Sequence, residues 1–524
     1  MSLHDLPPEL TAIVIEYLAQ QEPARLQHSI NSKPHISQYA STSLSIQYAV
    51  EQRLFTRLDI TSDELATFEE LVVQSPKRRG LLHILAFTPV LPRYDEVACS
   101  RFERPSDQQA NDDALTATMS TLYTSLRDCN KLTSIEIKIP YSPTDICKDR
   151  RARYADNRLD YMLGKRVDIW ERRYAQSLLS IRDSLNSPLL DQVTTFSMSG
   201  DYQRYVTPRS AVTLVRHHPR AEIVTLRLDD NERTRPELRV QLRTDLARDL
   251  LMTPCHAMRQ FHLSYRYEDP TDQRFTNVDV RGARENLPDD AFSTSLRQFL
   301  IAAPNLELVN LSGPICIDES FFELSDSPSR ERQWRGLREL HIEMSAVRPD
   351  GGWYLDEDSD IPRDEPSRQT PRALGETDDD DVDLTSDSES SAFSDDSFFA
   401  QDELQPDDFD PHRDALKTGD AYFLSFRFRP NAAFERVLEA AARFASLNEI
   451  TDMSLRMGVN GCPGTDQRAE MFELELRPKA SPGGISPCST LYLRVHREWQ
   501  MSDTLAELLN TRLGPEGVIT YERW

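Results

Sequence analysis

Apolar and polar residues alternate in nine short segments that are spread along the chain. The segments are residues 132–137, 193–198, 223–228, 258–263, 306–311, 337–342, 450–455, 472–476 and 491–495. A period of two places every second side chain on the same side of a β-strand, so each segment predicts a strand with one buried face. The last two segments flank a Pro- and Gly-rich stretch, and we expect them to pair as an antiparallel hairpin.

Helical spacing of apolar residues marks several segments between these strands. The predicted helices cover residues 151–186, 237–252, 292–303, 431–446 and 502–510. The helix at 292–303 ends at Pro304-Asn305, directly before the strand that starts at Leu306, which gives a unit of helix, proline and short strand. Because neither element of such a unit can bury its apolar face alone, neighbouring units are expected to stack around one continuous core.

The expected fold class is therefore α/β, with an irregular leucine-rich-repeat-like arched body. Successive strands lie at irregular distances along the chain, and no unit carries the full Leu-x-x-Leu-x-Leu-x-x-Asn consensus. A compact α/β domain with a mixed sheet is the alternative that the pattern leaves open.

An amphipathic helix is predicted near the N-terminal end, over residues 7–20. Its apolar residues recur at helical spacing, and they are Leu6, Leu10, Ile13, Val14, Tyr17 and Leu18. Asp5 is a suitable cap, and Pro7 and Pro8 suit a first turn, where a missing N–H costs little.

The formal net charge of -25 is concentrated in one segment. Residues 356–410 contain 21 acidic residues and three arginines, which gives -18 and leaves only -7 for the rest of the chain. Since so polar a segment cannot offset its ordering entropy by burial, we expect a disordered acidic insertion at 355–415. Ser386 and Ser394 have acidic residues shortly after them and are candidate phosphorylation sites, although we favour a purely solvating insertion with no specific role.

The remaining composition is that of a soluble protein. Of the 524 residues, 39% are apolar and 28% are charged, the mean hydropathy is -0.56, and the start of the chain has no signal-peptide pattern. No apolar stretch approaches the roughly 20 residues that a membrane helix needs. We expect a cytoplasmic or nuclear protein that binds neither membranes nor nucleic acid.

The sequence carries no motif for a catalytic, cofactor or metal site. Phosphate loops, nucleophile elbows, His-Glu-x-x-His motifs and dinucleotide-binding glycine patterns are absent. The seven cysteines are far apart and form no Cys-x-x-Cys pair, so reduced, partly buried thiols are expected. His217-His218 precede Pro219 at a predicted helix end, where cationic side chains suit the last carbonyls. No catalytic residue, cofactor or metal ligand is predicted, and an enzyme with an unrecognised site remains the least favoured alternative.

The sequence Leu6-Pro7-Pro8-Glu9-Leu10, followed by an Ile and Leu stripe, resembles the opening of an F-box. Residues 39–60, with a helix at 63–73 and a strand at 81–87, resemble fungal F-box-like proteins in the order helix, strand, helix, strand. The chain lacks the Trp of the Cys-x-x-Trp-like element that usually follows in an F-box. The resemblance implies an F-box-like helical module at 1–50, a repeat-like body at 51–354 and a continuation of that body at 416–524.

In that family the module binds the Skp-type adaptor of an SCF ubiquitin ligase, and the body presents a target protein. The resemblance implies that Leu6, Pro7, Pro8 and Leu10 face the adaptor or line the edge of the contact, and that Ile13 and Leu18 support the module. The expected function is a non-catalytic substrate receptor, with the adaptor and an unknown protein substrate as partners. A leucine-rich-repeat-like scaffold whose N-terminal helix is only a structural cap is the alternative.

Overall fold

The computed structural model describes most of the chain. The described residues are 7–20, 35–95, 98, 103–144, 160–162, 165–167, 177–182, 187–198, 204–233, 235–282, 290–323, 334, 336–357, 427–448, 450–459, 469–481, 484–496, 499–513 and 517–523. Ser386, Ser394 and nearly all of the predicted acidic insertion lie outside these residues, in 358–426.

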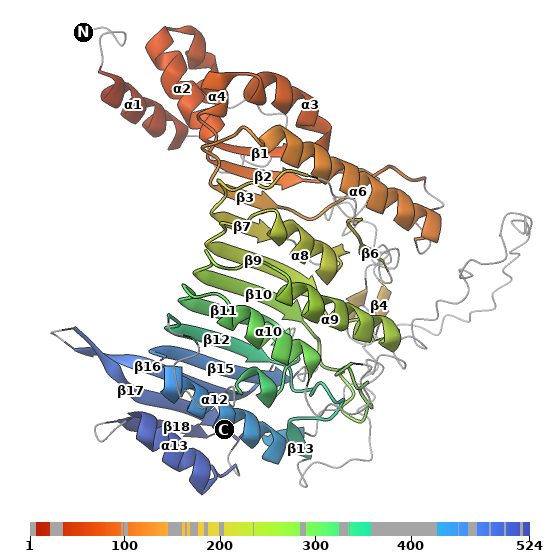
Figure 1. Cartoon of the computed structure of the whole chain (residues 1–524), viewed down its shortest axis with the longest axis vertical. Coiled ribbons are helices and arrows are strands. Elements are labelled where there is room, and N and C mark those ends of the chain that lie inside the picture. The colour runs from red at the N-terminus through yellow and green to blue at the C-terminus, as the bar shows by residue number, and fades with distance from the viewer. Residues whose placement is uncertain are drawn as a thin grey trace, which may run out of the picture.

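Within the described residues, twelve strands form one long sheet whose strand order follows the chain (Figure 1). In order, they are β1 (Arg57–Thr61), β2 (Ile84–Thr88), β3 (Ser134–Ile137), β7 (Thr195–Met198), β9 (Ile223–Asp229), β10 (Gln260–Arg266), β11 (Leu308–Ile315), β12 (Glu339–Met344), β15 (Asp452–Val459), β16 (Ala469–Ser481), β17 (Gly484–Val495) and β18 (Val518–Arg523). Pairing is parallel from β1 to β15, antiparallel for β15–β16 and β16–β17, and parallel again for β17–β18.

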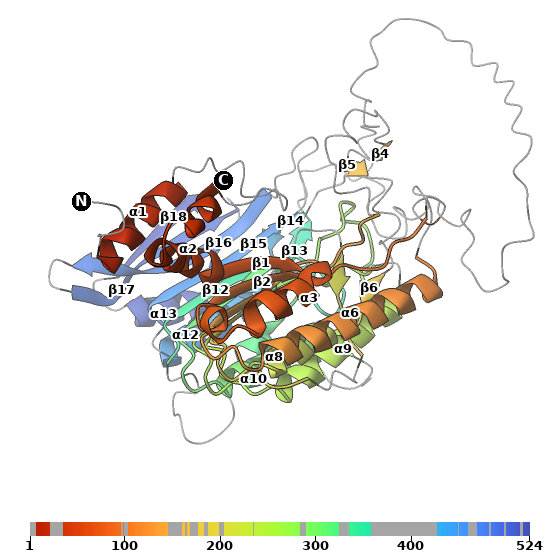
Figure 2. The same ribbon diagram turned by 90° about the horizontal axis from the view of Figure 1, so that it is seen from above.

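The main helices cover one face of this sheet (Figure 2). They are α6 (Pro105–Leu126), α8 (Pro208–Arg216), α9 (Pro236–Leu251), α10 (Ala291–Ile301), α12 (Ala432–Asn448) and α13 (Asp503–Leu513). Side-chain caps fix where some begin: Thr207 accepts from the Ser210 amide before α8, and Asp290 accepts from the Ser293 amide before α10. Parallel strands joined by helices on one face give stacked units that share a core.

The alternation of apolar and polar residues in the sequence matches the alternation of buried and more exposed side chains along the strands. In β10, Phe261, Leu263 and Tyr265 are buried beneath the helices, whereas the residues between them point to the opposite, less covered face. The apolar sides of successive strands and helices merge into one main core that extends from Leu65 to Leu513.

Three helical segments form a separate module beyond β1 (Figure 1). They are α1 (Pro8–Gln20), the 3₁₀ helix η3 (His35–Ser41) and α2 (Leu44–Thr56), and they pack around a small core of Ile15, Ile36, Ile46, Ala49 and Val50. The chain then enters β1 directly from α2. Between β1 and β2 lie the 3₁₀ helix η4 (Ser62–Glu64), α3 (Leu65–Phe68), the π-helical turn η5 (Glu69–Val73) and α4 (Pro76–Arg79).

Short strand pairs flank the main sheet. β4 (Asp160–Met162) pairs with β5 (Lys165–Val167), β6 (Leu178–Leu179) with β8 (Tyr205–Val206), and β13 (Leu355–Glu357) with β14 (Arg427–Pro430). Because Leu355 is buried and β13 pairs with β14, the predicted start of the disordered insertion at residue 355 is wrong: residues 355–357 belong to a strand.

The predicted α/β class is confirmed, and each of the nine predicted strands coincides with a strand of the main sheet. The hairpin of β16 with β17 and the helices at 237–252, 292–303, 431–446 and 502–510 are also confirmed. The helix predicted at 151–186 is wrong, because β4, β5 and β6 occupy the described part of that range. The sequence of that range includes Gly164, and glycine is unfavourable in a helix interior.

Candidate docking surface on the N-terminal helices

The helix α1 begins at Pro8, close to the predicted start. The Thr11 amide donates to the Pro7 carbonyl at 3.0 Å, and the Thr11 hydroxyl donates to the same oxygen at 3.2 Å. Pro8 suits the first helical position because the amide it lacks would have no partner within the helix.

Three large apolar side chains on α1 are exposed to solvent. Leu10 is 46% exposed, Ile13 is 62% exposed and Tyr17 is 61% exposed. Their spacing of three and four residues places them on one side of the helix. We call this row of Leu10, Ile13 and Tyr17 the docking stripe. A contiguous exposed apolar patch on a helix is typical of a surface that binds another protein.

The opposite side of α1 anchors the helix in the module. Ile15 is 3% exposed within the small core, and Leu18 packs against that core. Glu16 also forms an ion pair with Arg53 of α2 at 3.0 Å. The docking stripe therefore remains outside the module because other residues of α1 already fill its interior.

The predicted adaptor-binding residues divide between these two sides. Leu10 and Pro7 are exposed, and Leu18 packs against the small core of the module. Ile13 was expected to support the module as well, but its exposure places it on the docking stripe instead. Leu6 and the side chain of Pro8 lie outside the described residues.

Sequence reasoning missed two features of this surface. Tyr17 was read as part of the apolar stripe but not as a binding residue, and Leu44 at the start of α2 is 85% exposed. Ile15, which anchors α1, was absent from the predicted stripe. Apolar residues cover a wide arc of α1, and packing against η3 and α2 decides which of them are buried.

A buried ionic cluster lies between α9 and the sheet. Arg239 binds both carboxylate oxygens of Asp230 at 3.0 and 2.8 Å, and Arg243 bridges Asp230 at 2.8 Å and Asp290 at 3.0 Å. All four side chains are at most 4% exposed. Burial alone would raise the pKa of Asp230, but the two guanidinium groups hold it below its ordinary value. Because these charges are paired and buried, we assign the cluster a structural role in joining neighbouring units.

The histidines at the end of α8 are part of the core. The Tyr123 hydroxyl and His218 Nε2 lie 2.8 Å apart, and the His218 ring stacks on Phe196 with ring centres 4.6 Å apart. Burial, with a smaller contribution from His217, lowers the pKa of His218 to about 3. His218 is therefore neutral at physiological pH, and the predicted cationic role at the helix end is wrong for it. His217 Nδ1 does lie 2.9 Å from the Thr213 carbonyl.

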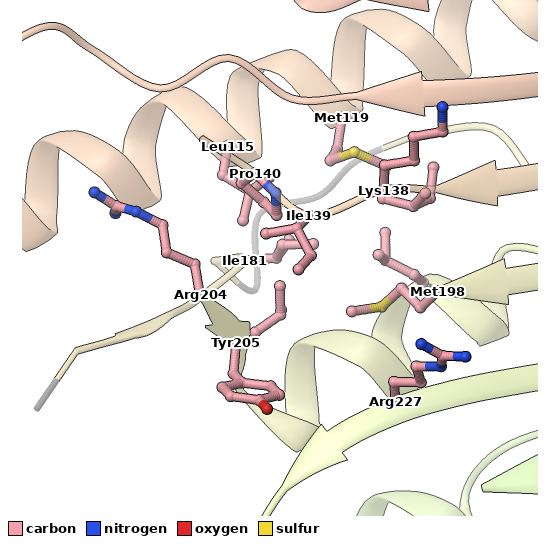
Figure 3. A pocket seen from close by; sticks show the side chains of 13 residues that line it. Leu115, Met119, Lys138, Ile139, Pro140, Ile181, Met198, Arg204, Tyr205 and Arg227 are labelled. Atoms are coloured by element: carbon pink, nitrogen blue, oxygen red, sulfur yellow. The ribbon is translucent and has the colours of Figure 1, made fainter. Parts of the chain in front are cut away.

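A small apolar cavity opens at the C-terminal ends of β3, β7 and β9 (Figure 3). Met119, Ile139 and Met198 point into it, and its volume is about 30 Å³. Arg204 belongs to its lining, but its guanidinium points away, and Arg204 Nη1 pairs with Glu103 at 2.9 Å. A space of this size holds a single water-sized group.

The thiols of Cys129, Cys255 and Cys316 are free and buried. Burial raises the pKa of Cys129 and Cys255 to about 11 and that of Cys316 to about 12. Among the described residues, no three His, Cys, Asp or Glu side chains are arranged to hold a metal ion. No helix in the described parts of the chain is both long enough and apolar enough to cross a membrane.

No protein-family model matches this chain, and no curated protein matches it significantly.

Proposed function

We propose that this protein is a substrate receptor of an SCF-type ubiquitin ligase, in which the N-terminal module binds a Skp-type adaptor. The observation that carries the proposal is the docking stripe, because Leu10, Ile13 and Tyr17 expose apolar surface on a helix whose other side is already packed. Removing such surface from water on binding is favourable by roughly 25 cal/mol per Å². The resemblance of residues 6–10 to the opening of an F-box suggests that the partner is a Skp-type adaptor.

The body supports the second half of the proposal. Twelve strands in the described residues form a long sheet, and the helices cover only one of its faces. An extended surface of this kind offers a large area for recognising a target protein, while a short helical module offers a constant attachment point. Transfer of ubiquitin would be performed by another subunit.

Co-purification with the adaptor tests the proposal. We expect the intact chain to retain the adaptor and the double variant Leu10→Asp, Ile13→Asp to lose it, because two carboxylates cannot be desolvated in an apolar contact. The matched control is Leu251→Asp, Met252→Asp, since these residues at the end of α9 are 50% and 67% exposed, close to the values for Leu10 and Ile13. Equally weak retention of the intact chain and the double variant would reject the receptor function and favour the scaffold alternative.

A further inference from the structure

A buried carboxylate joins the N-terminal module to the body. Glu51 on α2 is 7% exposed and forms ion pairs with two residues of α4, Lys77 at 3.1 Å and Arg78 at 3.0 Å. Gln47, one turn earlier on α2, donates to Glu51 Oε1 at 3.2 Å. We call Glu51, Lys77 and Arg78 the Glu51 clamp. It connects the last helix of the module to the first unit of the sheet.

Aromatic residues of α2 hold the two cations in place. Lys77 Nζ lies 5.2 Å from the centre of the Tyr48 ring, and the Arg78 guanidinium lies 5.1 Å from the centre of the Phe55 ring. Both distances are within the range of cation–π attraction. Each cation therefore contacts α2 twice, once through Glu51 and once through a ring.

The electrostatics keep the clamp charged at neutral pH. Burial by itself would raise the pKa of Glu51, but hydrogen bonds from Lys77, Arg78 and Gln47 lower it below its ordinary value. The Glu51 carboxylate accepts hydrogen bonds from three donors, and these bonds form only when the donors approach its oxygens from particular directions. The clamp therefore adds a directional restraint on α2 to the packing of Phe55 against the main core.

We propose that Glu51 is a positioning residue that fixes the angle between the docking stripe and the sheet. The module has its own core, separate from the main core, so its fold does not by itself determine that angle. The importance of the angle for ubiquitin transfer rests on the proposed function, because a receptor must hold its adaptor and its target in a constant relation. The positioning itself is a property of the chain alone.

Single-molecule energy transfer between a dye on the module and a dye on the body measures a distance that changes when this angle changes. Dyes are attached to genetically encoded unnatural residues at Ala12 on α1 and Thr121 on α6, both exposed. The wild-type chain should give one narrow distance distribution, and Glu51→Gln should broaden it and shift its mean. Glu16→Gln is the matched control, because Glu16 pairs with Arg53 inside the module, and it should leave the distribution unchanged.

A second variant separates positioning from simple unfolding of the module. Lys77→Gln, Arg78→Gln removes the clamp from the side of the body and should broaden the distribution as Glu51→Gln does. In both variants, hydrogen exchange at Ile46, Ala49 and Val50 should stay slow, because the small core of the module does not include the clamp. A wild-type distribution in both variants would overturn the inference, as would broadening accompanied by fast exchange in the module core.

The outcomes also separate this inference from the proposed function. Broadening by Glu51→Gln in a chain that never retains the adaptor supports the positioning role and rejects the receptor. An unchanged distribution in a chain that does retain the adaptor overturns the positioning role alone.

Discussion

Leu54 and Phe55 are adjacent on α2, yet they pack against different hydrophobic cores. Leu54 lies against the small core of the module, and Phe55 lies against the main core of the sheet. The boundary between the two cores thus runs through one helix, and the two parts should respond separately to substitution.

Ile46→Ala should loosen the module and leave the sheet intact. Ile46 is 5% exposed in the small core, and truncation of a buried isoleucine to alanine costs about 2–5 kcal/mol. Hydrogen exchange should accelerate in α1 and in the first half of α2, and β10 and β11 should keep their protection. The exposed Gln52→Ala on the same helix is the control. Equal acceleration in both parts would show that they unfold as one unit.

Arg243→Met should destabilise the body strongly. The substitution removes the cation that bridges Asp230 and Asp290, and loss of one partner from a buried ion cluster costs about 3–5 kcal/mol. Arg248→Met on the same helix is the control: its side chain is 53% exposed, it contacts Asp245 at 2.6 Å and the buried Asp249 only at 3.6 Å, and a loss of about 1 kcal/mol is expected. Urea denaturation measures both variants, and equal midpoints would refute the structural role of the cluster.

The sequence predicted the strands better than it predicted the helices. Alternation directly indicates a strand with one buried face, so β10 and β12 were located from the alternating residues around Phe261 and Leu340. Helix α6 was not predicted, since its first half carries mostly polar residues. That half is held by side-chain bonds that no periodicity reveals: Asp112 Oδ1 accepts from the Ser180 amide at 2.7 Å, and Asn111 donates to Glu103 at 2.8 Å.

The sequence predicted the docking stripe only in part, again because tertiary packing decides which residues are buried. The apolar spacing from Leu10 to Leu18 predicts a helix but does not say which side faces α2. Ile13 and Ile15 are equally apolar, but Ile15 is buried against η3 and α2, whereas Ile13 is exposed. Partnerships between distant residues, such as that of Glu51 with Arg78, likewise depend on tertiary structure.

Asp229→Asn should stabilise the protein increasingly as the pH rises from about 4 to 7. Burial, together with Asp230 and Glu268, raises the pKa of Asp229 from 3.8 to about 7. In this window the unfolded chain has lost the proton that the folded chain still holds, so the wild type loses stability as the pH rises, and asparagine does not. Urea denaturation between pH 4 and pH 8 checks this, and a constant difference between the two proteins would contradict it.

Tyr123→Phe should cost about 1–3 kcal/mol, because the buried His218 ring loses its hydrogen-bond partner. Tyr521→Phe is the matched control: the same hydroxyl is removed from a residue that is 47% exposed on β18, where a change within about 0.5 kcal/mol is expected. Thermal unfolding of the two variants distinguishes them. Equal loss of stability in both would show that the buried contact contributes nothing of its own.

The most direct test of the central claim is a titration of the intact chain with a purified Skp-type adaptor. We predict saturable binding that Leu10→Asp, Ile13→Asp weakens by more than about 30-fold, since central apolar contacts are worth 2 kcal/mol or more each. The control Leu251→Asp, Met252→Asp should bind as the wild type does. Absence of binding by the intact chain, or equal affinity of the double variant and the wild type, would contradict the account.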